Sequence, residues 1–340
     1  MKIVSVEESI GMVLCQDITR IVPGEFKGVL FKKGHIVREE DIEALLKVGK
    51  EHLYVWDPEL GDVHENDAAI RIAKAVCGEN IHYDENPKEG KCGLTAKIRG
   101  LFKVDSEKLI DINSVEYVTV ATLPGNYHVE AGAKLGGARV VPLAVKAAVL
   151  DEVEGFCQDG PIIDVVPYKN LKCGIVTTGS EVFKGRIEDK FGPVMREKIA
   201  FHDSQCLGQT ICPDDKDTIL QAIQDYKDQG ADLIILTGGM SVDPDDVTPS
   251  AIRSTGASVI SYGAPAQPGN MLMLAYWDET ALIGVPGCAM FFETTVLDII
   301  LSHVFIGEKL SKRDFARLGE GGFCQGCEIC RYPHCYFGRK

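Results

Sequence analysis

Four loops rich in glycine or hydroxyl residues follow apolar runs in the second half of the chain. The apolar runs end at Val176, Leu236, Tyr262 and Val285. Glycine lets the backbone approach a ligand closely, and the N–H groups that open a following helix attract anions. One such loop is explained equally well as a strand-to-helix turn, but several on one sheet edge predict a site for a phosphorylated ligand. The loops read Thr177-Thr178-Gly179-Ser180-Glu181, Thr237-Gly238-Gly239-Met240-Ser241, Gly263-Ala264-Pro265 and Pro286-Gly287-Cys288-Ala289-Met290.

Carboxylates gather next to these loops. Asp243, Asp245 and Asp246 follow the Gly238-Gly239 pair, and Asp189 lies in a separate loop. Carboxylates beside a phosphate usually require a hard cation such as Mg²⁺ between them. The alternative for Asp245 or Asp246 is helix capping, and the alternative for Asp189 is a solvated turn.

Two common nucleotide-binding signatures are missing from the sequence. No loop has the Walker A pattern, and no glycine group has the G-x-G-x-x-G spacing of dinucleotide-binding folds. ATPase and NAD-dehydrogenase functions therefore lose their main support.

The elements around the loops alternate between strands and helices. We expect strands at 173–177, 205–212, 233–236, 258–262 and 281–285, and helices at 193–202, 214–229, 246–254 and 287–304. This order predicts an α/β domain whose mostly parallel sheet is covered by helices on both faces. Ligands of such sheets bind beyond the carboxyl ends of the strands, where the four loops lie.

The first half of the chain has a different texture. Residues 1–60 predict a small α+β unit, and residues 65–76 predict a helix with one apolar face. We expect an exposed loop at 80–93, β-rich structure at 115–145 and an acidic separator at 151–168. The predicted divisions are 1–60, 61–168, 169–306 and a tail of 307–340.

Residues 170–306 resemble the molybdenum-cofactor biosynthesis, or molybdopterin-binding, domain family. The resemblance rests on Gly174–Glu181, Gly185–Asp189, Leu236–Val242, Asp246–Pro249 and Val285–Gly287. It implies that the loops bind molybdopterin or its adenylated form, a pterin phosphate, together with Mg²⁺. The implied ligand-binding residues are Thr178, Gly179, Ser180, Glu181, Gly238, Gly239, Met240, Ser241, Pro286 and Gly287. The implied catalytic residues are Asp189, Asp243 and Asp246, of which Asp243 and Asp246 would hold the Mg²⁺.

The sequence departs from the molybdotransferase pattern at two places. This chain has Gln267-Pro268-Gly269-Asn270 where molybdotransferases have a segment similar to Pro-Gly-Lys-Pro. It has Pro286-Gly287-Cys288-Ala289 where they have a segment similar to Pro-Gly-Asn-Pro. The missing lysine removes the natural partner of molybdate. The resemblance as a whole implies a role in molybdenum-cofactor biosynthesis through Mg²⁺-dependent nucleotidyl or molybdate transfer. The alternatives are a non-catalytic carrier that inserts the cofactor into a molybdoenzyme, and a pyrophosphatase-type hydrolase of the same fold.

The last 17 residues contain four cysteines in a dense array. Cys324, Cys327, Cys330 and Cys335 are spaced by two, two and four residues. This density predicts Zn²⁺ or an iron–sulfur cluster, although the final gap and the missing proline differ from a ferredoxin run. The alternative is a set of free thiols on a solvated tail.

Composition limits the remaining possibilities. The 340 residues are 45% hydrophobic and carry a net charge of −14, with 50 acidic and 36 basic side chains. This charge argues against broad binding to nucleic acid or anionic lipid. We expect a cytoplasmic protein without a membrane segment, and the family resemblance implies a homo-oligomer.

Overall fold

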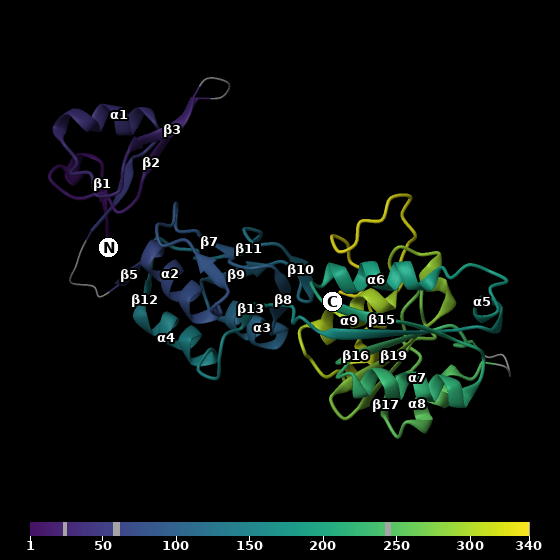
Figure 1. Ribbon diagram of the computed structural model, residues 1–340. Helices are drawn as coiled ribbons and strands as arrows, with labels where there is room; N and C mark the ends of the chain where they lie inside the picture. The colour runs from purple at the N-terminus through teal and green to yellow at the C-terminus, as the bar shows by residue number, and fades with distance from the viewer. Residues whose placement is uncertain (23–25, 57–61, 242–245, 340) are drawn as a thin grey trace. The chain divides into compact units, whose positions relative to one another are not determined.

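The computed structural model describes residues 1–22, 26–56, 62–241 and 246–339, and they form two compact units (Figure 1). Unit 1 contains residues 1–98, 104–123 and 131–165, and unit 2 contains residues 99–103, 124–130 and 166–340. None of the described helices is long and apolar enough to cross a membrane. The predicted divisions at 60, 168 and 306 stay a prediction.

Unit 1 is built from small antiparallel sheets and short helices. Strand β1 (Lys2–Ser5) pairs with β4 (His52–Val55), and β2 (Ile18–Val22) pairs with β3 (Phe26–Phe31). Helix α1 covers Ile42–Lys47, and β5 (Asp62–His64) pairs with β12 (Ala144–Lys146). A four-stranded sheet has the order β6-β7-β11-β9. Its strands cover Ile81–Tyr83, Cys92–Ala96, Lys134–Val140 and Val118–Thr122, and helix α2 (Glu65–Val76) packs on it.

Two sequence predictions for unit 1 need correction, and one helix of this unit was not predicted. The segment predicted as an exposed loop at 80–93 contains β6 and the start of β7. Helix α3 (Ser106–Ser114) was not predicted, and helix α4 (Ala147–Phe156) extends into the predicted separator at 151–168. The acidic residues that indicated a linker lie on the solvent side of α4, while Leu150 and Val153 are buried. An amphipathic helix of only ten residues is easily read as a polar segment.

Unit 2 centres on a six-stranded sheet with the order β15-β14-β16-β19-β18-β17. The strands cover Gln205–Cys212, Lys172–Thr178, Leu233–Thr237, Thr280–Val285, Met273–Trp277 and Ser258–Tyr262. The first four strands are parallel to one another, and β18 is antiparallel to both of its neighbours. Strand β8 (Gly100–Val104) pairs antiparallel with β10 (Tyr127–Val129), and residues 99–103 and 124–130 also belong to this unit. Strand β13 covers Ile163–Val166.

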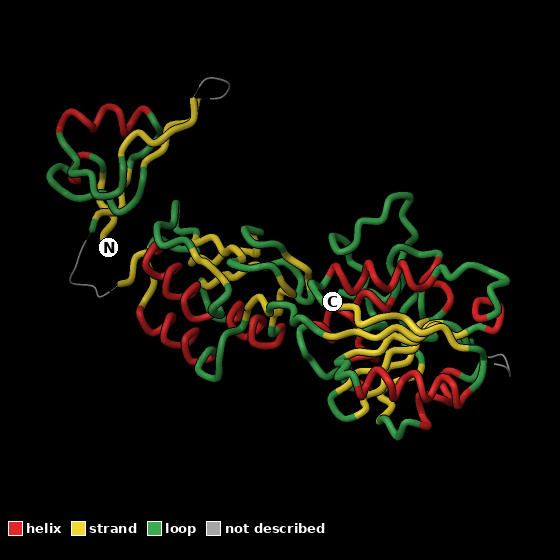
Figure 2. The backbone as a smooth tube through the Cα atoms, viewed as in Figure 1, coloured by secondary structure: helices red, strands yellow, loops and turns green. Residues whose placement is uncertain are grey.

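Helices cover both faces of this sheet, which confirms the predicted α/β class (Figure 2). Strand β16 shows why, because all five of its residues are buried. Leu233 and Ile235 join the core formed with α6 (Phe191–Phe201), α9 (Val296–Phe305) and α10 (Lys312–Arg317). Ile234 and Leu236 join the core formed with α7 (Lys216–Asp228) and α8 (Thr248–Ser254). Side chains on a strand alternate between the two faces of the sheet, so a continuously apolar strand requires that both faces be covered.

One predicted element of unit 2 differs from the structure, and one strand was not predicted. Strand β18 was not expected, and the helix expected at 287–304 is a 3-10 turn at Gly287–Met290 followed by α9. The break comes from a capping box in which the Thr295 hydroxyl and the Asp298 carboxylate each accept a backbone N–H. This arrangement fixes the start of a helix locally. Residues 291–294 therefore leave the helix.

Candidate functional site

A cleft of about 760 Å³ opens where the parallel strands end. Because β14, β16 and β19 are parallel neighbours, their carboxyl ends meet at one edge of the sheet. The cleft is lined by Thr177, Thr178, Gly179, Ser180, Glu181, Val182, Ile187, Glu188, Asp189, Lys190, Phe191, Asp214, Gly239, Asp246 and Met290.

The cleft gathers seven of the residues proposed from sequence. These are Thr178, Gly179, Ser180, Glu181, Asp189, Gly239 and Asp246. Gly238, Met240, Ser241, Pro286 and Gly287 are not among the lining residues, and Met240 is buried in the core. Asp243 lies outside the described residues. Roles for all of these residues remain predictions.

The Gly238-Gly239 pair has a conformation and a setting that exclude larger residues. Gly238 has a φ of +88°, and a Cβ there would lie 2.1 Å from the Thr178 carbonyl oxygen. Gly239 has a φ of +55°, and a Cβ there would lie 2.8 Å from the Thr248 hydroxyl. The Thr248 hydroxyl donates to the Gly238 carbonyl oxygen at 3.0 Å and lies 3.2 Å from the Thr178 hydroxyl. These contacts hold the loops after β14 and β16 tightly together.

The loop after β14 has a partner that the sequence reasoning missed. The Ser180 N–H donates to the Asp214 carboxylate at 2.7 Å, and the Asp214 N–H donates to the Ser180 hydroxyl at 3.4 Å. The amide at the start of the short helix α5 (Ser180–Phe183) is therefore already bonded. Asp214 follows β15, so the rule of reading residues after each strand could have identified it.

Asp189 is more than a solvated turn residue. Its Oδ1 accepts the Phe191 N–H at 2.9 Å, and its Oδ2 accepts the Gly192 N–H at 3.0 Å. Oδ2 also accepts a hydrogen bond of 2.6 Å from the amide nitrogen of Gln209. Asp189 thus closes the N-terminus of α6 while it lines the cleft.

Asp246 keeps an acceptor that no described residue occupies. Its Oδ2 is buried and has no hydrogen-bond partner within the described part of the chain. Helix α8 has Val247 at its N-cap and no side-chain capping bond, so capping does not account for Asp246. A buried carboxylate oxygen without a partner is costly. The oxygen therefore fits a cation or a hydrogen-bond donor supplied by a ligand.

The cysteine tail does not present an assembled metal site. All four cysteines are free, and Cys330 lies 3.3 Å from the Thr294 hydroxyl. The described ranges contain no group of three or more His, Cys, Asp or Glu residues placed to hold a metal. The structure thus does not support the predicted zinc or iron–sulfur site.

The end of the tail is packed rather than solvated, which corrects the alternative considered from sequence. Arg339 is only 7% exposed. Its guanidinium donates to the carbonyl oxygens of Cys335, Pro333 and Asn126, at 2.9, 2.5 and 2.6 Å, and lies 4.0 Å from the centre of the Tyr127 ring. The tail therefore anchors the segment that contains β10.

The family comparison covers the part of the chain that forms the cleft. Residues 174–304 match the family described as a probable molybdopterin binding domain. This part of the chain is a molybdopterin-binding-type domain. The match confirms the resemblance inferred from the loop sequences. Residues 3–57 match a domain of unknown function (DUF8806).

Curated relatives match a segment of the chain. A CinA-like protein of Mycobacterium avium (strain 104) is 35% identical over 79 residues, which is 23% of this chain and 18% of the relative. A CinA-like protein of Mycobacterium tuberculosis (strain ATCC 25618 / H37Rv) is 34% identical over 79 residues. The chain thus matches less than a fifth of the length of these relatives.

Solved structures similar to the molybdopterin-binding-type domain include two proteins named MoaB. The molybdopterin biosynthesis enzyme MoaB of Thermus thermophilus is 18% identical, with 41% of this chain and 98% of that chain covered and a TM-score of 0.32. The tungsten cofactor synthesizing protein MoaB of Pyrococcus furiosus is 26% identical, with 40% and 94% covered and a TM-score of 0.34.

Proposed function

We propose that the cleft of the molybdopterin-binding-type domain holds molybdopterin or its adenylated form, and that the protein acts in molybdenum-cofactor biosynthesis. The family match supports the ligand class. The observation that carries the proposal is the convergence of the Thr178–Glu181 loop, Gly239, Asp189 and Asp246 on one cleft. Small residues there leave room for a phosphate, and the carboxylates provide the oxygens that a hard cation requires.

Asp246 is the residue that we assign to Mg²⁺, together with Asp189 or Asp243. The buried, unpartnered Oδ2 of Asp246 fits this role, and Asp189 is held in place by three donors. Bound Mg²⁺ would neutralise the phosphate during nucleotidyl or molybdate transfer. The protein's own contribution would be to orient the phosphate against the Gly238-Gly239 backbone and to fix the carboxylates.

Catalysis and simple carriage of the cofactor are separate forms of this proposal. The lysine that the molybdotransferase pattern places after Gly269 is replaced by Asn270, which favours a carrier that docks on a molybdoenzyme. Turnover of molybdopterin with ATP and Mg²⁺, or with molybdate, would establish a transferase. Binding without turnover would establish a carrier, and light scattering would test the proposed homo-oligomer.

A second candidate is a pyrophosphatase-type hydrolase. The segment Pro244–Thr248 resembles competence/damage-inducible-type proteins, and the curated relatives carry the name CinA-like. Incubation of the full chain with nucleotide pyrophosphates and Mg²⁺ tests this candidate. Release of a mononucleotide would favour it, and its absence would remove it.

The central experiment is the identification of the bound ligand. We expect a fluorescent pterin in extracts of the purified full chain, and saturable binding when molybdopterin is added back. Asp246→Asn should weaken that binding at least tenfold in the presence of Mg²⁺. Asp228→Asn is the matched control, because Asp228 is exposed at the end of α7, at the sheet edge opposite the cleft. If wild-type protein neither contains nor binds a pterin, the proposed function is wrong.

A further inference from the structure

Gln209 is an amide in the middle of β15 that contacts two residues of the cleft without lining it. Its side-chain nitrogen donates to Asp189 Oδ2 at 2.6 Å and to the Thr177 hydroxyl at 2.8 Å. An amide nitrogen has two protons, so each bond uses one of them. Gln209 therefore connects the wall of the cleft formed by Asp189 with the end of β14.

Arg196 on α6 determines which way this amide points. One guanidinium nitrogen donates to Gln209 Oε1 at 3.2 Å. The oxygen of Gln209 thus faces a donor, while its nitrogen faces two acceptors. The reversed amide would place its oxygen against the Asp189 carboxylate and its nitrogen against the guanidinium, and both of these contacts would become unfavourable, while the Thr177 hydroxyl can bond to either end of the amide.

The surroundings leave this network little freedom. A Cβ at Gly192 would lie 2.2 Å from Gln209 Oε1 and 2.5 Å from Asp189 Oδ2, so only glycine leaves space for the pair. Thr177 is 1% exposed, and its hydroxyl also accepts a bond of 3.1 Å from the Thr237 hydroxyl. The Gln209 amide therefore meets an acceptor that is itself fixed to the neighbouring strand β16.

The network leaves Asp189 with one acceptor position. A carboxylate offers about four lone-pair sites, and the Phe191 N–H, the Gly192 N–H and Gln209 use three of them. The remaining site is on Oδ1, because Oδ2 accepts two bonds. The orientation of the carboxylate decides whether this site faces the cleft.

We propose that Gln209, oriented by Arg196, is a positioning residue that fixes the Asp189 carboxylate and the Thr177 hydroxyl for ligand binding in the cleft. The proposal rests on the proposed function, because it assumes that the cleft binds a pterin phosphate. Gln209 acts through Asp189 and Thr177 and touches no ligand itself. The proposal adds to the site a residue that lies within strand β15, whereas the residues after β14 and β16 lie in loops.

The first test uses two substitutions that remove the amide in different ways. Gln209→Met removes both donors at similar size, and Gln209→Glu replaces the donor with a carboxylate that faces Asp189. We expect Gln209→Met to weaken molybdopterin binding by tenfold to about a hundredfold at every pH, as for the loss of a charge-assisted hydrogen bond. We expect Gln209→Glu to bind as weakly near pH 8 and to recover as the pH falls toward 5, because a proton shared between two carboxyls restores a donor.

The control is Gln205→Glu, which makes the same charge change on an exposed residue of the same strand. It should bind like the wild type throughout. Equal affinities for the wild type and both Gln209 variants, or a Gln209→Glu loss that does not change with pH, would overturn the positioning role. Absence of binding to the wild type would instead refute the proposed function.

A second measurement tests the positioning role without any ligand. A double-mutant cycle of Asp189→Asn and Gln209→Met on the free energy of unfolding should show strong coupling, because each residue loses the same hydrogen bond. Each substitution raises the equilibrium constant of unfolding by some factor. We expect that factor to be at least several-fold smaller when the other substitution is already present. Additive effects would mean that Gln209 does not hold Asp189, whatever the cleft binds.

Discussion

Replacing Asp246 with alanine distinguishes a ligand-binding carboxylate from a helix cap by the sign of the stability change. If Asp246 capped α8, its loss would lower the free energy of unfolding by about 0.5–2 kcal/mol. The structure shows no such cap and a buried Oδ2 without a described partner. A buried unpaired polar group costs about 1–3 kcal/mol. We therefore expect Asp246→Ala to leave the ligand-free protein unchanged or to stabilise it by about 1–2 kcal/mol.

The same substitution should remove the response to Mg²⁺. A cation that binds only the folded state adds about 2.7 kcal/mol to the free energy of unfolding at a hundred times its Kd. With a denaturant slope of about 2–3 kcal/mol/M, the urea midpoint of the wild type should rise by about 1 M. The midpoint of Asp246→Ala should not move. Asp228→Ala, on the exposed end of α7, should respond to Mg²⁺ like the wild type.

Tryptophan fluorescence can report this unfolding from the correct unit. The chain has two tryptophans, Trp56 in unit 1 and Trp277 at the end of β18 in the six-stranded sheet. In a Trp56→Phe background, the urea curve follows the sheet that carries the cleft. A loss of about 0.5–2 kcal/mol with an intact Mg²⁺ response would refute our reasoning and make Asp246 a structural residue.

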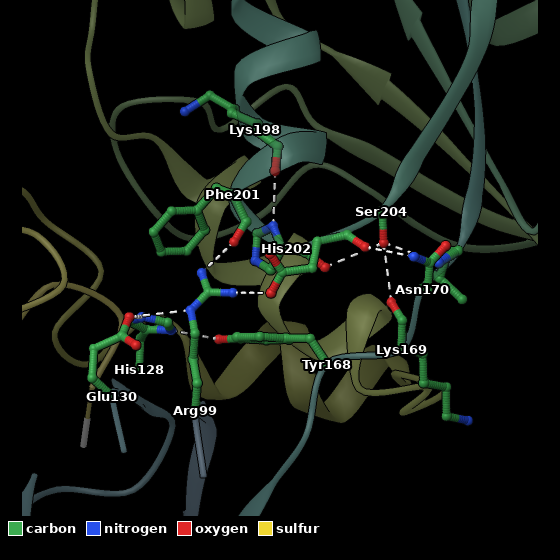
Figure 3. Close-up of polar contacts among 12 residues, drawn as sticks. Arg99, His128, Glu130, Tyr168, Lys169, Asn170, Lys198, Phe201, His202 and Ser204 are labelled. Atoms are coloured by element: carbon green, nitrogen blue, oxygen red, sulfur yellow. Dashed lines mark hydrogen bonds and ion pairs between the residues drawn. The ribbon is translucent and has the colours of Figure 1, made fainter. Parts of the chain in front are cut away.

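Four further predictions concern the loop, the pH response and the tail. Gly238→Ala should abolish pterin binding and cost at least about 1–2 kcal/mol, because alanine is strained at a φ of +88°. The control is Gly230→Ala, which is strained at a φ of +77° in open space outside the cleft and should lose stability but still bind the pterin. Burial lowers the pKa of His202 from 6.5 to about 4. Between these two pH values the unfolded state binds more protons than the folded state, so about 3 kcal/mol of stability should be lost as the pH falls from 6.5 to 4. His202 lies among Tyr168, Phe201 and Arg99 (Figure 3), and His202→Phe should flatten this part of the urea-midpoint profile. Arg339→Met should cost about 3 kcal/mol or more in urea unfolding, because three carbonyl oxygens lose their donor, and Arg331→Met on the exposed part of the tail is its control. Metal analysis of anaerobically purified protein tests the sequence prediction of one equivalent of zinc, or of iron with sulfide, at the four tail cysteines; four freely titrating thiols is the outcome that the described arrangement favours.

The sequence alone identified most of unit 2. Its strands are short apolar runs that end in glycine or hydroxyl residues, and both signals are local. Strands β15 and β17 were predicted with the bounds that the structure shows. The loops after β14 and β16 were predicted to converge because parallel strands end at a common edge. By contrast, the amphipathic helix α4 and the antiparallel strand β18 were missed, since short segments give weak periodic signals.

The tertiary structure decided which of the predicted residues share a site and what holds them. Met240 belongs to the same loop as Gly239, yet it packs against Gly284 in the core, and a loop sequence does not specify which side chains turn inward. Gln209 and Asp214 reach the cleft from β15 and the residues after it, 20 and 25 positions beyond Asp189. Arg339 is buried against Asn126, more than 200 residues away in sequence. Hydrogen bonds between residues so far apart in sequence depend on how the elements pack. The local sequence around one partner does not determine which distant residue it will contact.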